Sequence, residues 1–133
     1  MATPTLGYIG EKLDLTIRQG ATFGPFEVAL LNPDATAPSL TGSIIRGQIR
    51  KKALDAVVVA ALDVVINPDQ VGAGKGKFTF GMTAANTAAL TAGESITDPA
   101  SVYVWDMEWE DAATRVLPMY YGGVKVQREV TRV

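Results

Sequence analysis

The chain has 133 residues, a formal net charge of −2 and neither cysteine nor histidine. The length suits one domain with its own core, and the two absences exclude disulfides, thiol nucleophiles, Ser-His-Asp triads and the common zinc sites. The acidic balance argues against nucleic-acid binding, and no apolar run approaches the ~20 residues of a membrane-spanning helix, so we expect neither nucleic acid nor a membrane as a partner.

Residues 1–11 are predicted to form an extended arm ahead of a single domain over residues 12–133. The arm has three residues that interrupt regular structure: Pro4, Gly7 and Gly10. It lacks the basic and apolar blocks of a secretory signal. Its larger apolar side chains, Leu6, Tyr8 and Ile9, have little to bury against within the arm. We predict that they contact a neighbouring subunit, with the arm adding a strand to that neighbour's sheet edge.

The segments that follow are predicted to be strands. Apolar and polar residues alternate over residues 12–18. Residues 23–31 form a second strand, where Pro25 indicates an edge or a bulge. Residues 42–52 alternate again, and Gly47 on the apolar face indicates a bulge or a large side chain packed over it. Residues 57–66 form one long strand or two short ones, and residues 77–82 form another.

The second half of the chain contains the expected helix. Residues 84–91 are predicted to be helical, with Thr83 as the N-cap and Gly93 at the end. The clearest strand covers residues 102–110 and places four large side chains on one face: Tyr103, Trp105, Met107 and Trp109. A hairpin loop over residues 111–114 leads into final strands at 115–121 and 124–133, separated at Gly122-Gly123. The predicted fold is all-β: a small antiparallel, Ig-like β-sandwich of about seven or eight strands with one short helix near 84–91.

The stretch VGAGKGKF, residues 71–78, has the composition of a phosphate-binding loop. A P-loop needs a glycine five positions before the glycine of Gly-Lys-Ser/Thr. Asp69 and Val71 occupy those positions relative to Gly74 and Gly76. A strand rather than a helix is predicted next, which removes the helix N-terminus that would hold an anion. We interpret the stretch as a turn and expect no cofactor.

The remaining candidate clusters each have a structural and a functional interpretation. Asp106, Glu108 and Glu110 share one strand face. The structural interpretation is a solvated sheet surface with cross-strand partners such as Lys125 or Arg128. The functional interpretations are the two carboxylates of a glycosidase or a set of calcium ligands. Four cations, Arg46, Arg50, Lys51 and Lys52, are interpreted as a solvated strand end. Trp105 and Trp109 are interpreted as core, with Trp109 the nearer to the surface. Tyr120 and Tyr121 are consecutive, so one of them is expected to be exposed.

Five phrases occur in a distinctive order: LDLTIRQGATFGPFEVAL, SLTGSIIRGQIRKK, GKFTFGMTAANTAAL, VYVWDMEWEDAATRVL and GGVKVQREVTR. Their order and spacing, over about residues 13–133, resemble a family of short structural proteins of tailed bacteriophages. The resemblance implies an Ig-like or baseplate-adaptor-type sandwich and a place in the virion. It carries over no catalytic residue, and the arm is longer than is usual in that family.

The expected function is that of a non-enzymatic structural component of a tailed phage virion, in the tail, neck or fibre-attachment region, made in the host cytoplasm. The expected partners are copies of itself and other virion proteins, such as tail, portal, adaptor or fibre subunits. The predicted interface residues are Leu6, Tyr8, Ile9, Trp109, Tyr120 and Tyr121.

Three alternatives remain at this point. One is a capsid decoration protein. Another is a carbohydrate-binding module, which needs Trp109 and one of Tyr120 or Tyr121 exposed and coplanar. The third is a glycosidase, which needs two of the carboxylates Asp106, Glu108 and Glu110 in a cleft.

Overall fold

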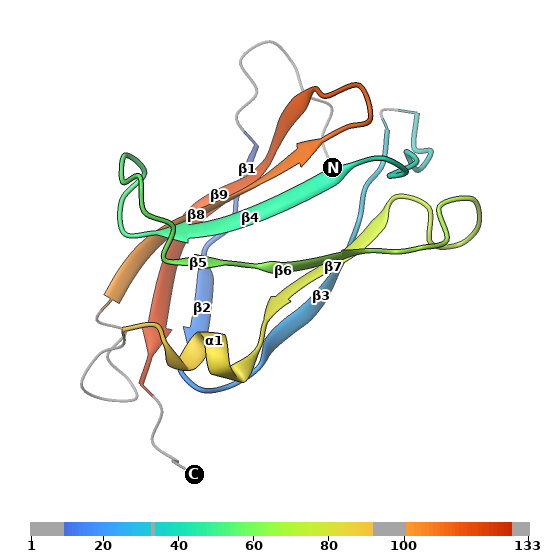
Figure 1. Cartoon of the computed structure of the whole chain (residues 1–133). Coiled ribbons are helices and arrows are strands. Elements are labelled where there is room, and N and C mark those ends of the chain that lie inside the picture. Colours follow the sequence, from blue (N-terminus) through green and yellow to red (C-terminus); the bar gives the residue numbers. More distant parts are fainter. Residues whose placement is uncertain (1–9, 33, 92–100, 129–133) are drawn as a thin grey trace.

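Two β-sheets packed face to face make up most of the structure, a computed structural model that describes residues 10–32, 34–91 and 101–128 (Figure 1). Sheet A contains β1 (Glu11–Lys12), β2 (Leu15–Arg18), β4 (Ile44–Arg50), β5 (Ala60–Ala61), β8 (Ser101–Glu110) and β9 (Val116–Gln127). Sheet B contains β3 (Phe23–Ala29), β6 (Asp63–Ile66) and β7 (Lys77–Met82). The single described helix, α1 (Ala84–Ala88), is short. The predicted all-β sandwich is confirmed.

One hydrophobic core lies between the two sheets. The predicted inward face of β8 is confirmed, since Tyr103, Trp105, Met107 and Trp109 are all buried. Trp105 stacks on Phe80 of the opposite sheet, with ring centroids 6.1 Å apart. Each large apolar side chain buried in this way contributes about 1.5–3 kcal/mol, so the contact between the two faces is the main source of stability.

The chain changes sheets between β5 and β6. Ala60 and Ala61 pair with β4 in sheet A, and Asp63 begins a strand that pairs with β7 in sheet B. The segment over residues 57–66 is therefore two short strands. Leu62 at the change of sheet is buried, and a Cβ added to Gly47 would lie 2.7 Å from its Cδ1. The prediction that a large side chain covers Gly47 is confirmed.

The first and last strands run parallel, a departure from the antiparallel arrangement expected. β1 and β2 both pair with β9, with Leu15 opposite Val124 and Ile17 opposite Val126. The predicted break at Gly122-Gly123 is wrong, because β9 continues through both glycines. The break lies instead in the segment that pairs with β9, at residues 13–14 between β1 and β2. A Cβ on Gly122 would collide with the carbonyl oxygen of Leu13, so glycine allows the close approach of the two backbones.

Two further predictions concern the ends of helix α1 and the irregularity in strand β3. The side chain of Thr83 accepts a hydrogen bond from the Asn86 N–H (3.2 Å), which confirms it as the N-cap of α1. The helix ends at Ala88, earlier than predicted, and Gly93 lies outside the described residues. The register of edge strand β3 shifts between Phe23 and Phe26, which confirms the irregularity expected from Pro25.

In the described part of the chain, no helix has the length and apolar character needed to cross a membrane.

Candidate functional site

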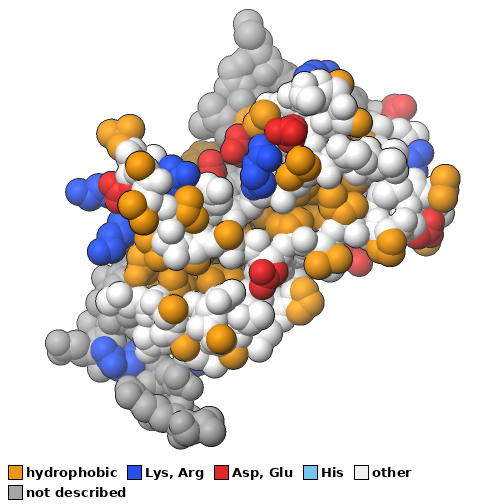
Figure 2. All heavy atoms as spheres, viewed as in Figure 1, with side chains coloured by type: hydrophobic (Ala, Val, Ile, Leu, Met, Phe, Trp, Pro, Cys, Tyr) orange, Lys and Arg blue, Asp and Glu red, His pale blue; other side chains and the backbone are white. Residues whose placement is uncertain are grey.

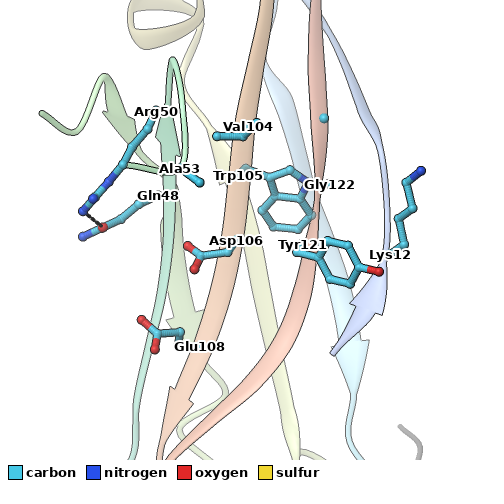
Figure 3. Close-up of a pocket in the computed structure, with 11 residues that line it drawn as sticks. Lys12, Gln48, Arg50, Ala53, Val104, Trp105, Asp106, Glu108, Tyr121 and Gly122 are labelled. Carbon is cyan, nitrogen blue, oxygen red and sulfur yellow. Dashed lines mark hydrogen bonds between the residues drawn. The ribbon is translucent and has the colours of Figure 1, made fainter. Parts of the chain in front are cut away.

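A groove of about 620 Å³ lies on the outer face of sheet A, the face turned away from the core (Figure 3). Its floor is formed by β8 and β9, and the turn after β4 and the strand β1 supply residues at its sides. The residues that line it are Lys12, Gln48, Arg50, Ala53, Val104, Trp105, Asp106, Glu108, Tyr121, Gly122 and Gly123. The volume falls within the range of small-molecule sites, roughly 300–1,000 Å³.

The period-2 geometry of the strands places these side chains together. Val104, Asp106 and Glu108 alternate with the buried residues of β8 and so face outward. In the ladder, Asp106 lies between Gln48 of β4 and Tyr121 of β9. Gly122 and Gly123, which follow Tyr121, contribute no side chain to the lining. The Leu13 backbone fills the space beside Gly122, whereas a Cβ on Gly123 would meet nothing closer than 3.8 Å.

A β-bulge decides which of the two consecutive tyrosines faces the groove. Met107 pairs with Tyr120 but Glu108 pairs with Pro118, so Met119 is an extra residue in β9. Met119 is buried, and Tyr120 also packs against the core, where its ring stacks on Trp105 at 6.2 Å. Tyr121 then points outward and is 37% exposed. One exposed tyrosine was expected, and it is Tyr121.

The carboxylates of the groove have no protein partner among the described residues. Arg46 reaches Glu110 at 3.2 Å, outside the groove, and neither Asp106 nor Glu108 accepts a described hydrogen bond. The predicted cross-strand partners Lys125 and Arg128 are therefore replaced by Arg46, from the strand on the other side of β8. No group of three acidic side chains in the described ranges is arranged to hold a metal ion.

Arg50, on one side of the groove, is held by hydrogen bonds within the protein. Arg50 donates to the backbone carbonyl of Asp55 (2.9 Å) and to Oε1 of Gln48 (3.0 Å), which fixes both side chains. Figure 3 shows this pair on one side of Asp106, with Tyr121 and Lys12 on the other. Lys51 and Lys52 are exposed in the turn that follows β4. From the sequence, Arg50 was predicted only as part of a solvated strand end, and Gln48 and Lys12 were not predicted as site residues. The outward alternation of β4 is the signal that identifies Gln48 and Arg50.

Among the described residues predicted to form an interface, Trp109 and Tyr120 do not line the groove. Trp109 is only 8% exposed, and its Nε1 donates to Oγ of Ser43 at 2.9 Å. The exposed Trp–Tyr platform is wrong, because the Trp109 ring completes the core and its one polar atom is hydrogen-bonded internally. The three predicted arm contacts lie outside the described residues: Leu6, Tyr8 and Ile9.

The glycine-rich stretch is a turn, as predicted. Its backbone N–H groups bind side chains of the same loop, because Gly72 donates to Oδ1 of Asp69 (2.9 Å) and Gly76 donates to Oε1 of Gln70 (3.1 Å). Strand β7 follows directly. A phosphate group would have to displace these internal acceptors, so the loop is built for closure rather than for anion binding.

No protein-family model matches this sequence, and no curated protein matches it.

Proposed function

We propose that the protein is a non-enzymatic structural subunit of a tailed phage virion, in the tail, neck or fibre-attachment region, and that it acts by docking on copies of itself and on other virion proteins. The observation that carries this proposal is a pair of unpaired strand edges beside exposed aliphatic side chains. The resemblance in the order of the sequence phrases supplies the virion setting. The absence of cysteine and histidine from the sequence narrows the chemistry available to an enzyme.

The first unpaired edge belongs to β4. All seven residues of β4 pair with β8 on one side, but on the other side β5 pairs only with Gln48 and Ile49. One further hydrogen bond on that side, from the Leu62 N–H to the Gly47 carbonyl, reaches one residue beyond Gln48. Within the described ranges, no strand pairs with residues 44–46 on that side. The second edge is β6, the outer strand of sheet B. Such edges present free backbone donors and acceptors to an incoming strand.

Aliphatic side chains accompany both edges. Ile44 at the start of β4 is 49% exposed and Val65 in β6 is 62% exposed. Figure 2 shows hydrophobic side chains gathered in a band across this face, over the region between β4 and β6. Apolar side chains gathered on one face of a protein are typical of protein contact sites. The arm, with Leu6, Tyr8 and Ile9 and no charged side chain before Glu11, is a segment of suitable chemistry to cover such a band in a neighbour.

The test measures the mass of the purified protein in solution by light scattering, for the full chain, for the chain without residues 1–10, and for Val65→Lys. We expect an oligomer that falls to monomer in both variants, because a charge on an edge strand opposes strand addition. Val71→Lys is the matched control, since Val71 is 94% exposed in the loop between β6 and β7 and belongs to neither edge strand, and it should leave the mass unchanged. A folded monomer for the full chain would contradict self-docking.

The virion setting needs its own measurement. Mass spectrometry of purified tailed particles should detect the chain in a fixed ratio to the other particle proteins. A chain found only in the lysed-cell fraction, and never in particles, would contradict the virion assignment whatever the oligomeric state.

A further inference from the structure

The groove on the outer face of sheet A plays no part in the docking edges proposed above. Its lining comes from β1, β4, β8, β9 and the turn after β4, whereas the aliphatic band lies between β4 and β6. It combines a concave floor, one exposed aromatic ring and four charged side chains. A flat, solvated sheet face needs none of these together, so the combination sets the groove apart from the rest of the face.

Tyr121 gives the groove an apolar surface with a polar tip. Its ring faces outward because the bulge at Met119 turns Tyr120 toward the core. Gly123, two residues further along β9, leaves open floor near the ring, because a Cβ there would meet nothing closer than 3.8 Å. An exposed aromatic ring above an open floor can stack against a flat ligand face made of C–H groups, while the hydroxyl remains available for a hydrogen bond.

The polar groups supply acceptors and donors in balanced numbers. Asp106 and Glu108 are acceptors with no described protein partner. Arg50 and Lys12 are donors, and Gln48 offers its amide N–H groups because its Oε1 already accepts from Arg50. The two carboxylates and the two cations cancel in formal charge. An anionic ligand would meet Asp106 and Glu108 across the floor, and a cationic ligand would meet Arg50 and Lys12 at the sides, so the balance favours a neutral ligand rich in hydroxyl groups.

We propose that this groove is a binding site for a neutral saccharide, held by stacking on Tyr121 and by hydrogen bonds from its hydroxyl groups to Asp106 and Glu108. Sugar hydroxyls donate to carboxylates and accept from cationic or amide donors, and the C–H face of a pyranose ring packs on an aromatic plane. The open shape of the groove suits a segment of a chain better than an enclosed monosaccharide. This site goes beyond the proposed docking function and does not depend on it.

The test is an amide NMR titration with neutral oligosaccharides of glucose, galactose, mannose and N-acetylglucosamine, with a sulfated oligosaccharide and oligolysine as charged comparators. At least one neutral probe should shift the amide signals of Asp106, Gly122 and Gly123. Tyr121→Ala should weaken that binding about tenfold, the loss expected for one stacking contact. Tyr121→Phe, which keeps the ring, should bind within about threefold of the original protein.

Two further variants separate the groove from the rest of the surface. Asp106→Ala should also weaken binding about tenfold, whereas Val71→Ala, in the distant loop, should leave it unchanged. The proposal is overturned if no neutral probe shifts the groove amides at about 10 mM, if only a charged comparator does so, or if Tyr121→Ala binds as well as the original protein. The oligomeric mass reports on docking alone, so the two proposals fail independently.

Discussion

At the scale of single residues, the carbonyl oxygen of Leu13 is the point where three distant parts of the chain meet. The buried indole Nε1 of Trp105 donates to it at 2.7 Å, and the Leu13 N–H donates to the Tyr121 carbonyl at 2.8 Å. Asp14 then accepts from the Gly123 N–H at 2.9 Å. An indole N–H without a partner in this core would cost about 1–3 kcal/mol. The missing side chain of Gly122 leaves room for this arrangement.

The adjacent glycines provide a matched pair of substitutions. Gly122→Ala should lower the free energy of unfolding by about 3 kcal/mol or more, because the new Cβ meets backbone that cannot move away without breaking the bond to Trp105. Gly123→Ala should change it by less than about 1 kcal/mol, since its nearest neighbour would lie 3.8 Å away. Urea denaturation of both variants measures the difference. Equal effects at the two positions would refute this account of Gly122.

At the scale of elements, the β8–β9 ribbon is closed by a turn built around one aspartate. Oδ1 of Asp111 accepts from the backbone N–H groups of Ala113 (3.0 Å) and Arg115 (2.9 Å), and Oδ2 accepts from Nε of Arg115 (2.8 Å). The backbone hydrogen bond from Arg115, helped by its side chain and its charge, lowers the pKa of Asp111 below the usual 3.8. The turn and the Met119 bulge together set the register of the ribbon and therefore the direction of Tyr121.

This turn predicts a defined dependence of stability on pH. Because the folded-state pKa of Asp111 is lowered, its stabilising effect is present above the ordinary value of 3.8 and is lost as the pH falls through the folded-state value. Asp111→Asn should therefore lower the melting temperature at neutral pH, and the difference from the original protein should shrink in acid. Calorimetry from pH 7 to about pH 2 measures this. A difference that is as large in acid as at neutral pH would contradict the assignment to charge.

At the scale of the whole molecule, the two ends of the described chain are held together in one sheet. β2 lies along β9 and buries Leu15 and Ile17 against the core. On the other side of the molecule, the passage from β5 to β6 joins the two sheets through the buried Leu62. Removal of either link exposes core surface, so the domain is expected to unfold as one unit.

Two truncations test where the domain begins. Removal of residues 1–10 should leave a domain that still unfolds in one cooperative transition, because the first strand of sheet A begins at Glu11. Removal of residues 1–18 should lower the unfolding free energy by roughly 4–9 kcal/mol, from two buried aliphatic side chains and the lost partner of Trp105. That loss is comparable to the whole stability of a small domain. A similar melting temperature for both truncations would show that β2 is dispensable.

Much of the fold was predictable because each strand carries its own alternation. The inward faces of β4 and β8, the edge character of β3 and the turn at VGAGKGKF follow from local chemistry alone. The parallel pairing of β2 with β9 does not follow from local chemistry, because it joins segments more than 100 residues apart in sequence. The role of Gly122 depends on that pairing. The groove was missed for the same reason: alternation gives the face of Gln48 or Asp106, but not which strands are neighbours. The Met119 bulge hid the choice between Tyr120 and Tyr121.

The parallel pairing of β2 with β9 also decides how the domain responds to a mechanical load. A chain pulled by its two ends would draw the start of β2 and the end of β9 in opposite directions along their shared axis. The backbone hydrogen bonds between the two strands would then carry the force in shear. They would have to break together rather than one at a time, over the paired residues from Leu15 opposite Val124 to Arg18 opposite Gln127. The terminal pair therefore acts as a clamp, and the domain is suited to transmit tension between whatever is attached to its two ends.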